Sequence, residues 1–397
     1  MTAPTTAIAV LITTLVALGP LSTDFYLPAL PAITQALGTD VASTQLTLSV
    51  FLAGFGVGQL AYGPLSDRFG RRPVLLVGLV IYVLASIVCT LAPAIEALIA
   101  ARFLQALGAC AGPVLGRAIV RDIYGPHDAA RILSYMGAAM ALAPLIGPVL
   151  GGTLTVGFGW RATFVFLTLF SLAQSVLVWR MLGETNVHRD PGATRPGQIL
   201  GNFKALIGDR MYRGVLLCNA CTYAGLFSFI SGSPFVFINI FGFSPQAMGL
   251  AFGVMVSGYI VGTTISGRLS RRFGAPRLLF AGAVLGALAG VTMLVLALAG
   301  WEHPVSVMGP MVFFSCSLGL VMPNATAMGL APYPKMAGSA ASLMGFVQMS
   351  LSALVGTLVG HGLDGSVLPM VLGIVAGGIG CLLSYLLWVR PGVAATA

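Results

Sequence analysis

The sequence predicts an all-α membrane protein with 12 transmembrane helices in two pseudo-symmetric six-helix halves. Three observations support this fold class: the composition, the recurrence of long apolar runs and an internal repeat. Of the 397 residues, 57% are hydrophobic and only 8% are charged, whereas about 25% of a soluble domain is charged. Water is therefore not the solvent for most of this chain's surface.

The apolar runs place the spans, because about 20 residues are needed to cross a bilayer as a helix. The predicted spans lie at 6–30, 42–63, 74–93, 97–119, 132–156, 161–182, 212–240, 246–267, 277–300, 304–331, 336–360 and 367–389. The first run lacks the basic stretch that begins a secretory signal peptide, so we interpret it as a span.

The charges in the gaps between spans alternate in sign and predict the orientation. Eighteen of the 20 Lys and Arg residues fall in the gaps or at the span ends on one side. The gaps on the other side hold Asp40, Glu96, Glu302 and Asp364, with Arg161 as their only cation. Under the positive-inside rule the basic side is cytoplasmic and both termini lie there. This rule also explains the net charge of +9, which gives no indication of nucleic-acid binding.

An internal repeat divides the chain. The sequence GPLSDRFGRRPVLL at 63–76 recurs as GRLSRRFGAPRLL at 267–279, each time between the second and third span of its half. We therefore expect an N-terminal bundle at 1–182, a cytoplasmic linker at 183–211 and a C-terminal bundle at 212–397. A short amphipathic helix is predicted at 198–207.

Two ionisable residues lie well inside the predicted spans, Asp24 in the first and Arg102 in the fourth. Such a residue costs roughly 2.5–3.5 kcal/mol on insertion scales, so it is rare and suggests function. With a rise of about 1.5 Å per residue, both lie in the outer half of the bilayer and can pair if the two helices adjoin. The alternative for Asp24, which precedes Pro28, is that it caps a helix break near the outer surface.

A carboxyl group that alternates between sealed and wet surroundings can gain and lose a proton, as a proton-coupled carrier requires. Asp24 and Arg102 are therefore the candidates for proton coupling. One proton moving down about 100 mV and one pH unit supplies about 3.7 kcal/mol, enough for a roughly 500-fold solute gradient.

Further candidates are polar, aromatic, glycine and proline residues inside the spans. Facing a cavity, the polar and aromatic ones would suit an amphiphilic solute, and facing neighbouring helices they would join spans together. These candidate cavity residues are Tyr26, Gln105, Asn219, Tyr223, Phe227, Asn324 and Gln348. In the fifth span we expect a kink and close backbone approach, at Pro144, Gly147, Pro148, Gly151 and Gly152.

The twelve spans, the repeated GPLSDRFGRRP loop, RFLQALGA around Arg102 and the fifth-span APLIGPVLGG resemble the major facilitator superfamily. The fifth-span pattern is similar to the signature of its drug:proton antiporters. The stretches LSTDFYLPALPAI at 21–33, VRDIY at 120–124 and FSFISGSPFVFI at 227–238 resemble the bicyclomycin-resistance (Bcr/CflA) exporters.

This resemblance implies a proton-coupled exporter of drugs or small molecules in the bacterial inner membrane. It would work by alternating access around a central cavity lined by the first, fourth, seventh and tenth spans. Its cytoplasmic gate would use Asp67 to latch the two halves, at the positive N-terminal end of a helix in the other half. The residues implied in this gate are Asp67, Arg68, Arg71, Arg72 and Asp122.

Other functions remain open. Proton-coupled uptake of a small metabolite is the main alternative, and a non-transporting membrane sensor is another. The spans hold no nucleophile with its base and no phosphate loop, so we expect no enzyme. Cys218 and Cys221 have no nearby Cys or His to complete a metal site, so we expect no cofactor other than protons. The expected partners are a small amphiphilic molecule and the lipid bilayer, and we expect a monomer.

Overall fold

The structure, a computed structural model, describes residues 6–124, 126–187, 189–301, 303–363 and 365–392. Within these residues all regular secondary structure is helical, and twelve helical segments are long and apolar enough to cross a membrane. The predicted number of spans and the all-α fold class are confirmed. Glu302, Asp364 and both chain ends, which entered the predicted orientation, lie outside the described residues.

The first span, Thr6–Ala36, is a broken helix. It consists of α1 (Thr6–Val16), α2 (Leu18–Asp24), the 3-10 turn η1 (Leu27–Ala29) and α3 (Leu30–Ala36). Pro28 and Pro31 stand at the starts of η1 and α3, and proline cannot donate the backbone hydrogen bond that a continuous helix needs. The interruption leaves Asp24 as the last residue of α2.

The remaining helices of the N-terminal bundle are α4 (Val41–Phe69), α5 (Arg71–Leu91), α6 (Ile95–Ile123), α7 (Pro126–Phe158) and α8 (Arg161–Met181). The helix α9 (Pro196–Gly208) follows, where a short helix was predicted at 198–207. The C-terminal bundle comprises α10 (Arg210–Pro234), η2 (Phe235–Ile240), α11 (Pro245–Phe273), α12 (Ala275–Leu298), α13 (Pro304–Leu330), η3 (Pro334–Met336), α14 (Ala337–Gly362), α15 (Leu368–Ser384) and η4 (Tyr385–Val389).

The repeated loop has the same backbone form in both copies. Gly70 between α4 and α5 has a φ of 102°, and Gly274 between α11 and α12 has a φ of 78°. Both φ values lie in the left-handed region, which residues other than glycine rarely adopt. A tight turn that needs glycine therefore explains why this residue recurs in the repeat.

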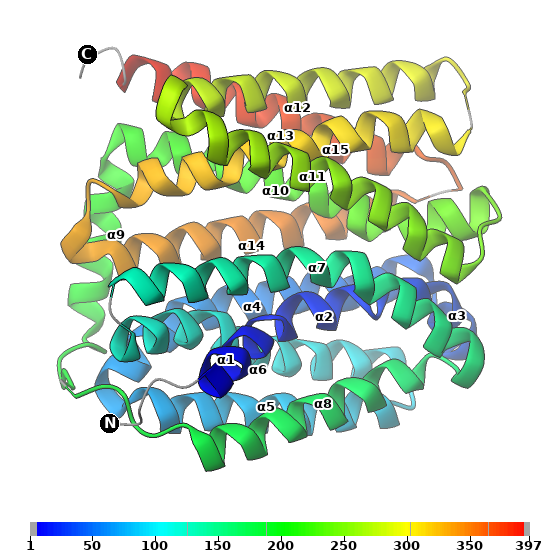
Figure 1. The fold of residues 1–397 in the computed structure, drawn as a ribbon. Coiled ribbons are helices and arrows are strands. Elements are labelled where there is room, and N and C mark those ends of the chain that lie inside the picture. Colours follow the sequence, from blue (N-terminus) through cyan, green and yellow to red (C-terminus); the bar gives the residue numbers. More distant parts are fainter. Residues whose placement is uncertain (1–5, 125, 188, 302, 364, 393–397) are drawn as a thin grey trace.

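Figure 1 shows α1–α8 below and α10–α15 above, with α9 running between them at one end of the molecule. The bundles meet where α4 packs on α14 and α7 packs on α11. We call the end that holds α9 and the loops at Gly70 and Gly274 the basic end. The opposite end holds the turns at Gly38 and Gly300.

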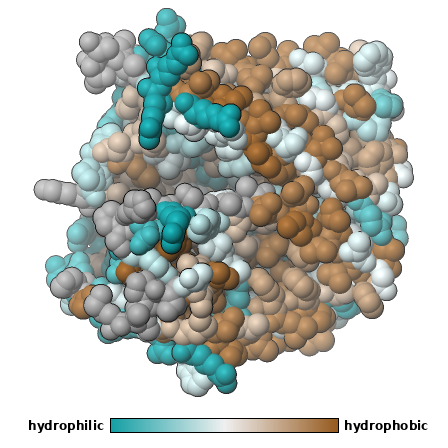
Figure 2. Space-filling model, viewed as in Figure 1, coloured by the Kyte–Doolittle hydropathy of each residue, from teal (hydrophilic) through white to brown (hydrophobic). Residues whose placement is uncertain are grey.

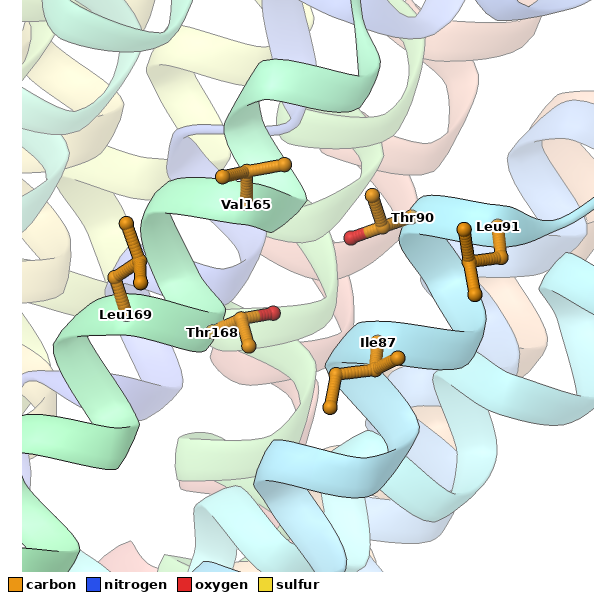
Figure 3. Close-up of a pocket in the computed structure, with 6 residues that line it drawn as sticks. All are labelled: Ile87, Thr90, Leu91, Val165, Thr168 and Leu169. Atoms are coloured by element: carbon orange, nitrogen blue, oxygen red, sulfur yellow. The ribbon is translucent and has the colours of Figure 1, made fainter.

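The surface matches a membrane-embedded bundle. In Figure 2 hydrophobic residues cover most of the visible face, and hydrophilic residues gather mainly at the basic end. Large apolar side chains such as Leu91, Leu169 and Leu298 are exposed on the helices. A groove of about 160 Å³ between α5 and α8 is lined by residues such as Ile87, Thr90 and Leu169 (Figure 3). Four of its six lining residues are aliphatic.

Candidate functional site

Arg102 is fully buried on α6, and it is enclosed by aromatic rings. Its guanidinium carbon lies 4.2 Å from the ring centre of Phe51 and 4.7 Å from that of Tyr26. One nitrogen, Nη1, donates to the Ser22 carbonyl at 3.0 Å and to Gln105 Oε1 at 2.7 Å. The other two, Nε and Nη2, have no hydrogen-bond partner. A buried cation with two unused donors is expensive unless it acquires a partner.

Asp24 is also buried, with 4% of its surface exposed. Thr23 Oγ1 donates to Asp24 Oδ1 at 3.2 Å, and Asp24 Oδ2 has no partner. A Cβ added to Gly147 of α7 would lie 2.7 Å from Asp24 Cβ. The Cβ and backbone of Asp24 are therefore packed against the glycine-rich face of α7.

The first and fourth spans adjoin, as a pairing of Asp24 with Arg102 requires, because Arg102 Nη1 donates to the Ser22 carbonyl. The predicted pairing of Asp24 with Arg102 is absent in this conformation, since no ion pair joins these two described residues. The helix geometry gives the reason. Ser22 and Asp24 are two residues apart, so their side chains point about 200° apart around α2. Ser22 Oγ lies 2.6 Å from Tyr82 Oη of α5, and Arg102 reaches the Ser22 carbonyl, whereas Asp24 Cβ faces Gly147 of α7.

A cavity of about 780 Å³ opens between the two bundles. It is lined from α4, α6 and α7 on one side and from α10, α13 and α14 on the other. Residues of α9 and of the 190–193 segment complete its wall, so the cavity lies toward the basic end. Among the described residues, the first span lines none of it, which differs from the lining that the family resemblance implied.

At the opposite end the bundles are in contact. Gln45 Nε2 of α4 donates to the Ser231 carbonyl of α10 at 2.8 Å, and Ser231 Oγ donates to Gln45 Oε1 at 3.0 Å. A Cβ added to Gly152 of α7 would lie 2.8 Å from the Pro245 carbonyl oxygen of α11. The structure is therefore open toward the basic end and closed toward the other.

Of the seven candidate cavity residues, Asn219 and Gln348 line this cavity. Gln105 is instead bonded to Arg102 and to Ser86 Oγ, and Asn324 Nδ2 donates to Ser266 Oγ at 2.8 Å. The other three also lie outside the lining in this conformation: Tyr26, Tyr223 and Phe227. A substrate role for them stays a prediction.

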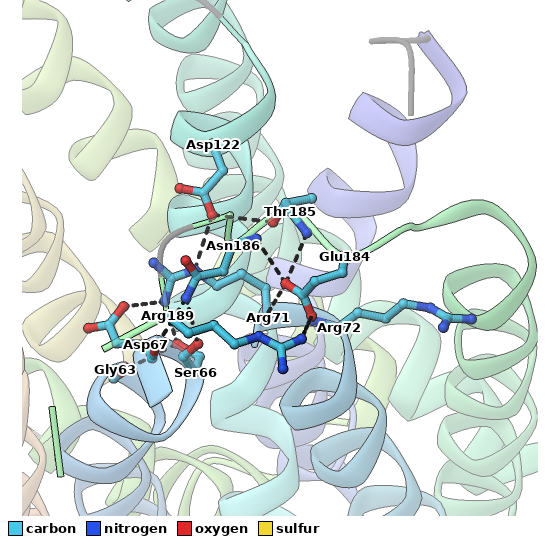
Figure 4. A network of polar contacts seen from close by, with 10 residues as sticks. All are labelled: Gly63, Ser66, Asp67, Arg71, Arg72, Asp122, Glu184, Thr185, Asn186 and Arg189. Carbon is cyan, nitrogen blue, oxygen red and sulfur yellow. Dashed lines mark hydrogen bonds and ion pairs between the residues drawn. The ribbon is translucent and has the colours of Figure 1, made fainter. Parts of the chain in front are cut away.

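Of the predicted gate residues, Asp67, Arg71 and Asp122 are joined by ion pairs at the basic end (Figure 4). Arg71 Nη1 donates to Asp67 Oδ1, and Arg71 Nε donates to Asp122 Oδ2 at 3.1 Å. Arg68 and Arg72 point elsewhere, to Thr194 Oγ1 and to the Trp179 carbonyl. The Asp67 carboxylate bonds within its own bundle while the cavity is open, and a latch to the other bundle stays a prediction.

The segment after α8 contains residues whose contacts the sequence analysis did not predict. Glu184 accepts hydrogen bonds from the backbone N–H groups of Arg71 and Arg72, at 2.9 and 3.3 Å, where α5 begins. A carboxylate at this position satisfies free N–H groups and complements the helix dipole. Asn186 Nδ2 donates to the carbonyls of Ser66 and Asp67. The available signal was an isolated Glu-Thr-Asn run directly after an apolar span.

The fifth-span pattern produces close approach. The helix α7 is continuous through Pro144 and Pro148. A Cβ on Gly151 would collide with the Phe25 backbone, and Gly152 faces the Pro245 backbone of the other bundle. The small residues thus allow α7 to touch both the first span and α11. The expected close packing is confirmed, and the expected kink stays a prediction.

These features define a membrane carrier: two helical bundles, a cavity between them that is open at one end, and buried ionisable groups within the spans. The sequence profile of the Major Facilitator Superfamily matches residues 12–357. The chain belongs to this superfamily, so it is a multi-pass membrane transporter with a small-molecule substrate and not an enzyme.

Similar proteins include resistance proteins of bacteria. The chain is 35% identical over 350 residues to a chloramphenicol resistance protein of Pseudomonas aeruginosa, covering 86% of this chain and 81% of that protein. It is 30% identical over 345 residues to a bicyclomycin resistance protein homolog of Haemophilus influenzae, covering 86% of each. The xylose transporter of Escherichia coli, in a partially occluded inward-open conformation, has the same fold, with a TM-score of 0.73 at 14% identity. That match covers 96% of this chain and 97% of the other.

Proposed function

We propose that this protein exports drug-like amphiphilic molecules in exchange for protons across a bacterial inner membrane. The relatives named for bicyclomycin and chloramphenicol resistance support export of antibiotics. With the basic end in the cytoplasm, as the positive-inside rule requires, the open cavity faces the compartment from which an exporter takes its cargo. The transporter works as a monomer, since one chain supplies both bundles and the cavity between them.

The observation that carries the coupling is a pair of incompletely bonded ionisable groups in the first and fourth spans. Asp24 Oδ2 and two nitrogens of Arg102 lack partners, and both residues are buried. In the membrane interior such groups persist where they serve transport or proton transfer.

The close packing of Asp24 on α7 supplies the mechanical link. Gly147 and Gly151 touch Asp24 and Phe25, while Gly152 of the same helix touches α11 of the other bundle. A rocking motion of the bundles therefore moves α7 against the carboxyl group and changes its exposure to water. Because hydration controls how readily a carboxyl group ionises, this motion would couple proton release to the conformational change. Arg102 provides a charge that the carboxylate can approach in the other state.

The test is accumulation of chloramphenicol and of bicyclomycin in cells that lack their own exporters, measured with and without a protonophore. We expect the protein to lower accumulation only while the proton gradient stands. The Asp24→Asn protein keeps the size of the side chain but cannot exchange a proton, so it should lose active export. Asp24→Glu should retain part of it.

Glu96→Gln is the matched control, because Glu96 is an exposed acid in the first turn of α6, outside the buried site of Asp24 and Arg102. This variant should export like the parent protein. Full export by Asp24→Asn at equal expression would remove Asp24 from the mechanism. Export that survives the protonophore would remove proton exchange altogether.

A further inference from the structure

Two arginines of α6 line the cavity next to each other. Arg117 and Arg121 are four residues apart, and both are lining residues together with Val114 and Ala118. The spacing 114, 117, 118 and 121 is one face of an α-helix. This face of α6 therefore presents two guanidinium groups to the cavity along one wall.

Neither arginine is neutralised by the protein. In the described part of the chain, Arg117 and Arg121 take part in no hydrogen bond and no ion pair. Arg71, the third arginine of the wall, differs because Asp67 and Asp122 both bind it. Like charges four residues apart on a helix repel each other, so the pair gains from an anion placed between or beside the two groups.

The acidic residues of the cavity lining form no ion pair with these two arginines. The acidic residues of its lining are Asp67, which is bound to Arg71, and Asp190, whose Oδ1 accepts from the Gly192 N–H. The facing wall of α14 presents small and uncharged residues. These are Gly338, Ala341, Ser342, Gly345 and Gln348.

The topogenic role of basic residues accounts for arginines in the loops at this end. That role does not by itself explain the position of Arg117. This arginine lies six residues before the end of α6, about 9 Å along the helix. Apolar side chains line the same cavity, among them Phe55, Met322 and Met349. Flexible methionines adapt to differently shaped apolar groups.

We infer that this cavity binds amphiphilic anions, with a carboxylate or sulfonate group at Arg117 and Arg121 and an apolar ring system against Phe55, Met322 and Met349. The inference rests on the proposed export function and adds anionic amphiphiles to the uncharged drugs that the export test uses. A guanidinium group binds such oxyanions with two parallel hydrogen bonds, which an analogue without the oxyanion group cannot accept.

The test compares two fluorescent probes that differ by one anionic group, 1-anilinonaphthalene-8-sulfonate and N-phenyl-1-naphthylamine. Binding is titrated on the purified full-length protein in phosphatidylcholine nanodiscs, with empty nanodiscs subtracted. These discs contain no anionic lipid, so the probe is the only organic anion tested. A second series uses nanodiscs that contain phosphatidylglycerol. If the lipid headgroups occupy the same arginines, they displace the sulfonate probe from the parent protein.

We expect Arg117→Gln to weaken sulfonate binding about tenfold or more, because hydrogen bonds to charged groups are the strong ones. Arg117→Lys should keep most of the affinity, and binding of the neutral probe should not change. Unchanged neutral binding also shows that the variant is folded. Arg268→Gln is the matched control, since this exposed arginine lies near the same end but outside the cavity lining. It should leave both affinities unchanged.

The inference is overturned if the parent protein binds both probes alike, or if Arg117→Gln and Arg268→Gln weaken the sulfonate probe equally. The anion site is supported if phosphatidylglycerol displaces the sulfonate probe from the Arg268→Gln protein but not from the Arg117→Gln protein. The binding measurement needs no proton gradient. Loss of the proposed proton exchange would therefore leave the probe affinities unchanged, and equal probe affinities would leave the effect of Asp24→Asn on export unchanged.

Discussion

Gly151 shows how one missing side chain controls the contact between α7 and the first span. A Cβ at this position would run into the Phe25 carbonyl, which is backbone and cannot turn aside. The helix would have to move outward at the place where Asp24 and Phe25 interrupt the first span. We expect Gly151→Ala to lower the free energy of unfolding by about 1–3 kcal/mol, the usual cost of overpacking, and to lower the melting temperature in detergent.

Gly157→Ala is the control for this prediction. Gly157 lies on the same helix, and a Cβ there would meet no atom within 4 Å. Alanine favours helix over glycine by about 1 kcal/mol, so this variant should melt at the same temperature or higher. A Gly151→Ala protein as stable as Gly157→Ala would show that α7 does not pack this closely on the first span.

At the residue scale, composition identified the unusual groups but not their contacts. Asp24 and Arg102 stand out in the sequence because ionisable residues inside spans are rare. Their depth and neighbourhood follow from helix geometry. The aromatic cage of Phe51, Tyr26 and Phe164 around Arg102 depends on how three separate spans are rotated. Hydropathy does not determine that rotation, so the direction of each side chain required coordinates.

At the scale of elements, the segment Glu184–Asn186 fastens the linker to the start of α5. The Glu184 carboxylate also accepts from the backbone N–H groups of Thr185 and Asn186, at 2.9 and 2.8 Å. This carboxylate therefore holds its own turn and the N-terminus of α5 together. Removing it should loosen the linker without unfolding the bundles.

We expect Glu184→Ala to speed tryptic cleavage after Arg189 of the linker about tenfold, since hydrogen bonds to a charged acceptor contribute about 1.5–3 kcal/mol. Cleavage rates of the purified protein, followed by mass spectrometry, measure this effect. Glu184→Gln retains an acceptor oxygen and should fall between the parent and Glu184→Ala. Glu96→Ala, at the opposite end, should cleave like the parent. Equal rates for all four proteins would mean that Glu184 does not hold the linker.

The elements themselves were largely predictable. Twelve spans follow from apolar length, and the helix at 198–207 followed from its amphipathic pattern and exists as α9. The extension of the first span to Ala36 was missed, because the prolines at 28 and 31 indicate a stop although the chain resumes helix after a turn. The contacts of Glu184 were missed because its partners are backbone groups more than 100 residues away.

At the scale of the whole molecule, one helix pair runs between the bundles from the closed end to the cavity. Gly360 of α14 packs on Gln45 of α4 at the closed end, and Gly345 of α14 packs on Gln59 at the cavity. In an alternating-access cycle the contact at the closed end must separate for the cavity to open on that side. Contacts around Gln45 are therefore expected to be temporary, although they are well packed in this state.

A disulfide across this contact tests the cycle. A Cβ built on Gly360 would lie 3.0 Å from Gln45 Cβ, and disulfides usually have a Cβ–Cβ distance of about 3.5–4.5 Å. A small outward shift of α14 thus permits a bond in the double variant Gln45→Cys and Gly360→Cys. We expect oxidation to stop chloramphenicol export almost completely and a reductant to restore it, because the bond holds the closed end shut. Each single cysteine variant should export equally well under both conditions. Full export by protein that mass spectrometry shows to be cross-linked would mean that α4 and α14 stay together here throughout transport. The substrate would then have to leave by a route other than separation of the two bundles at this end.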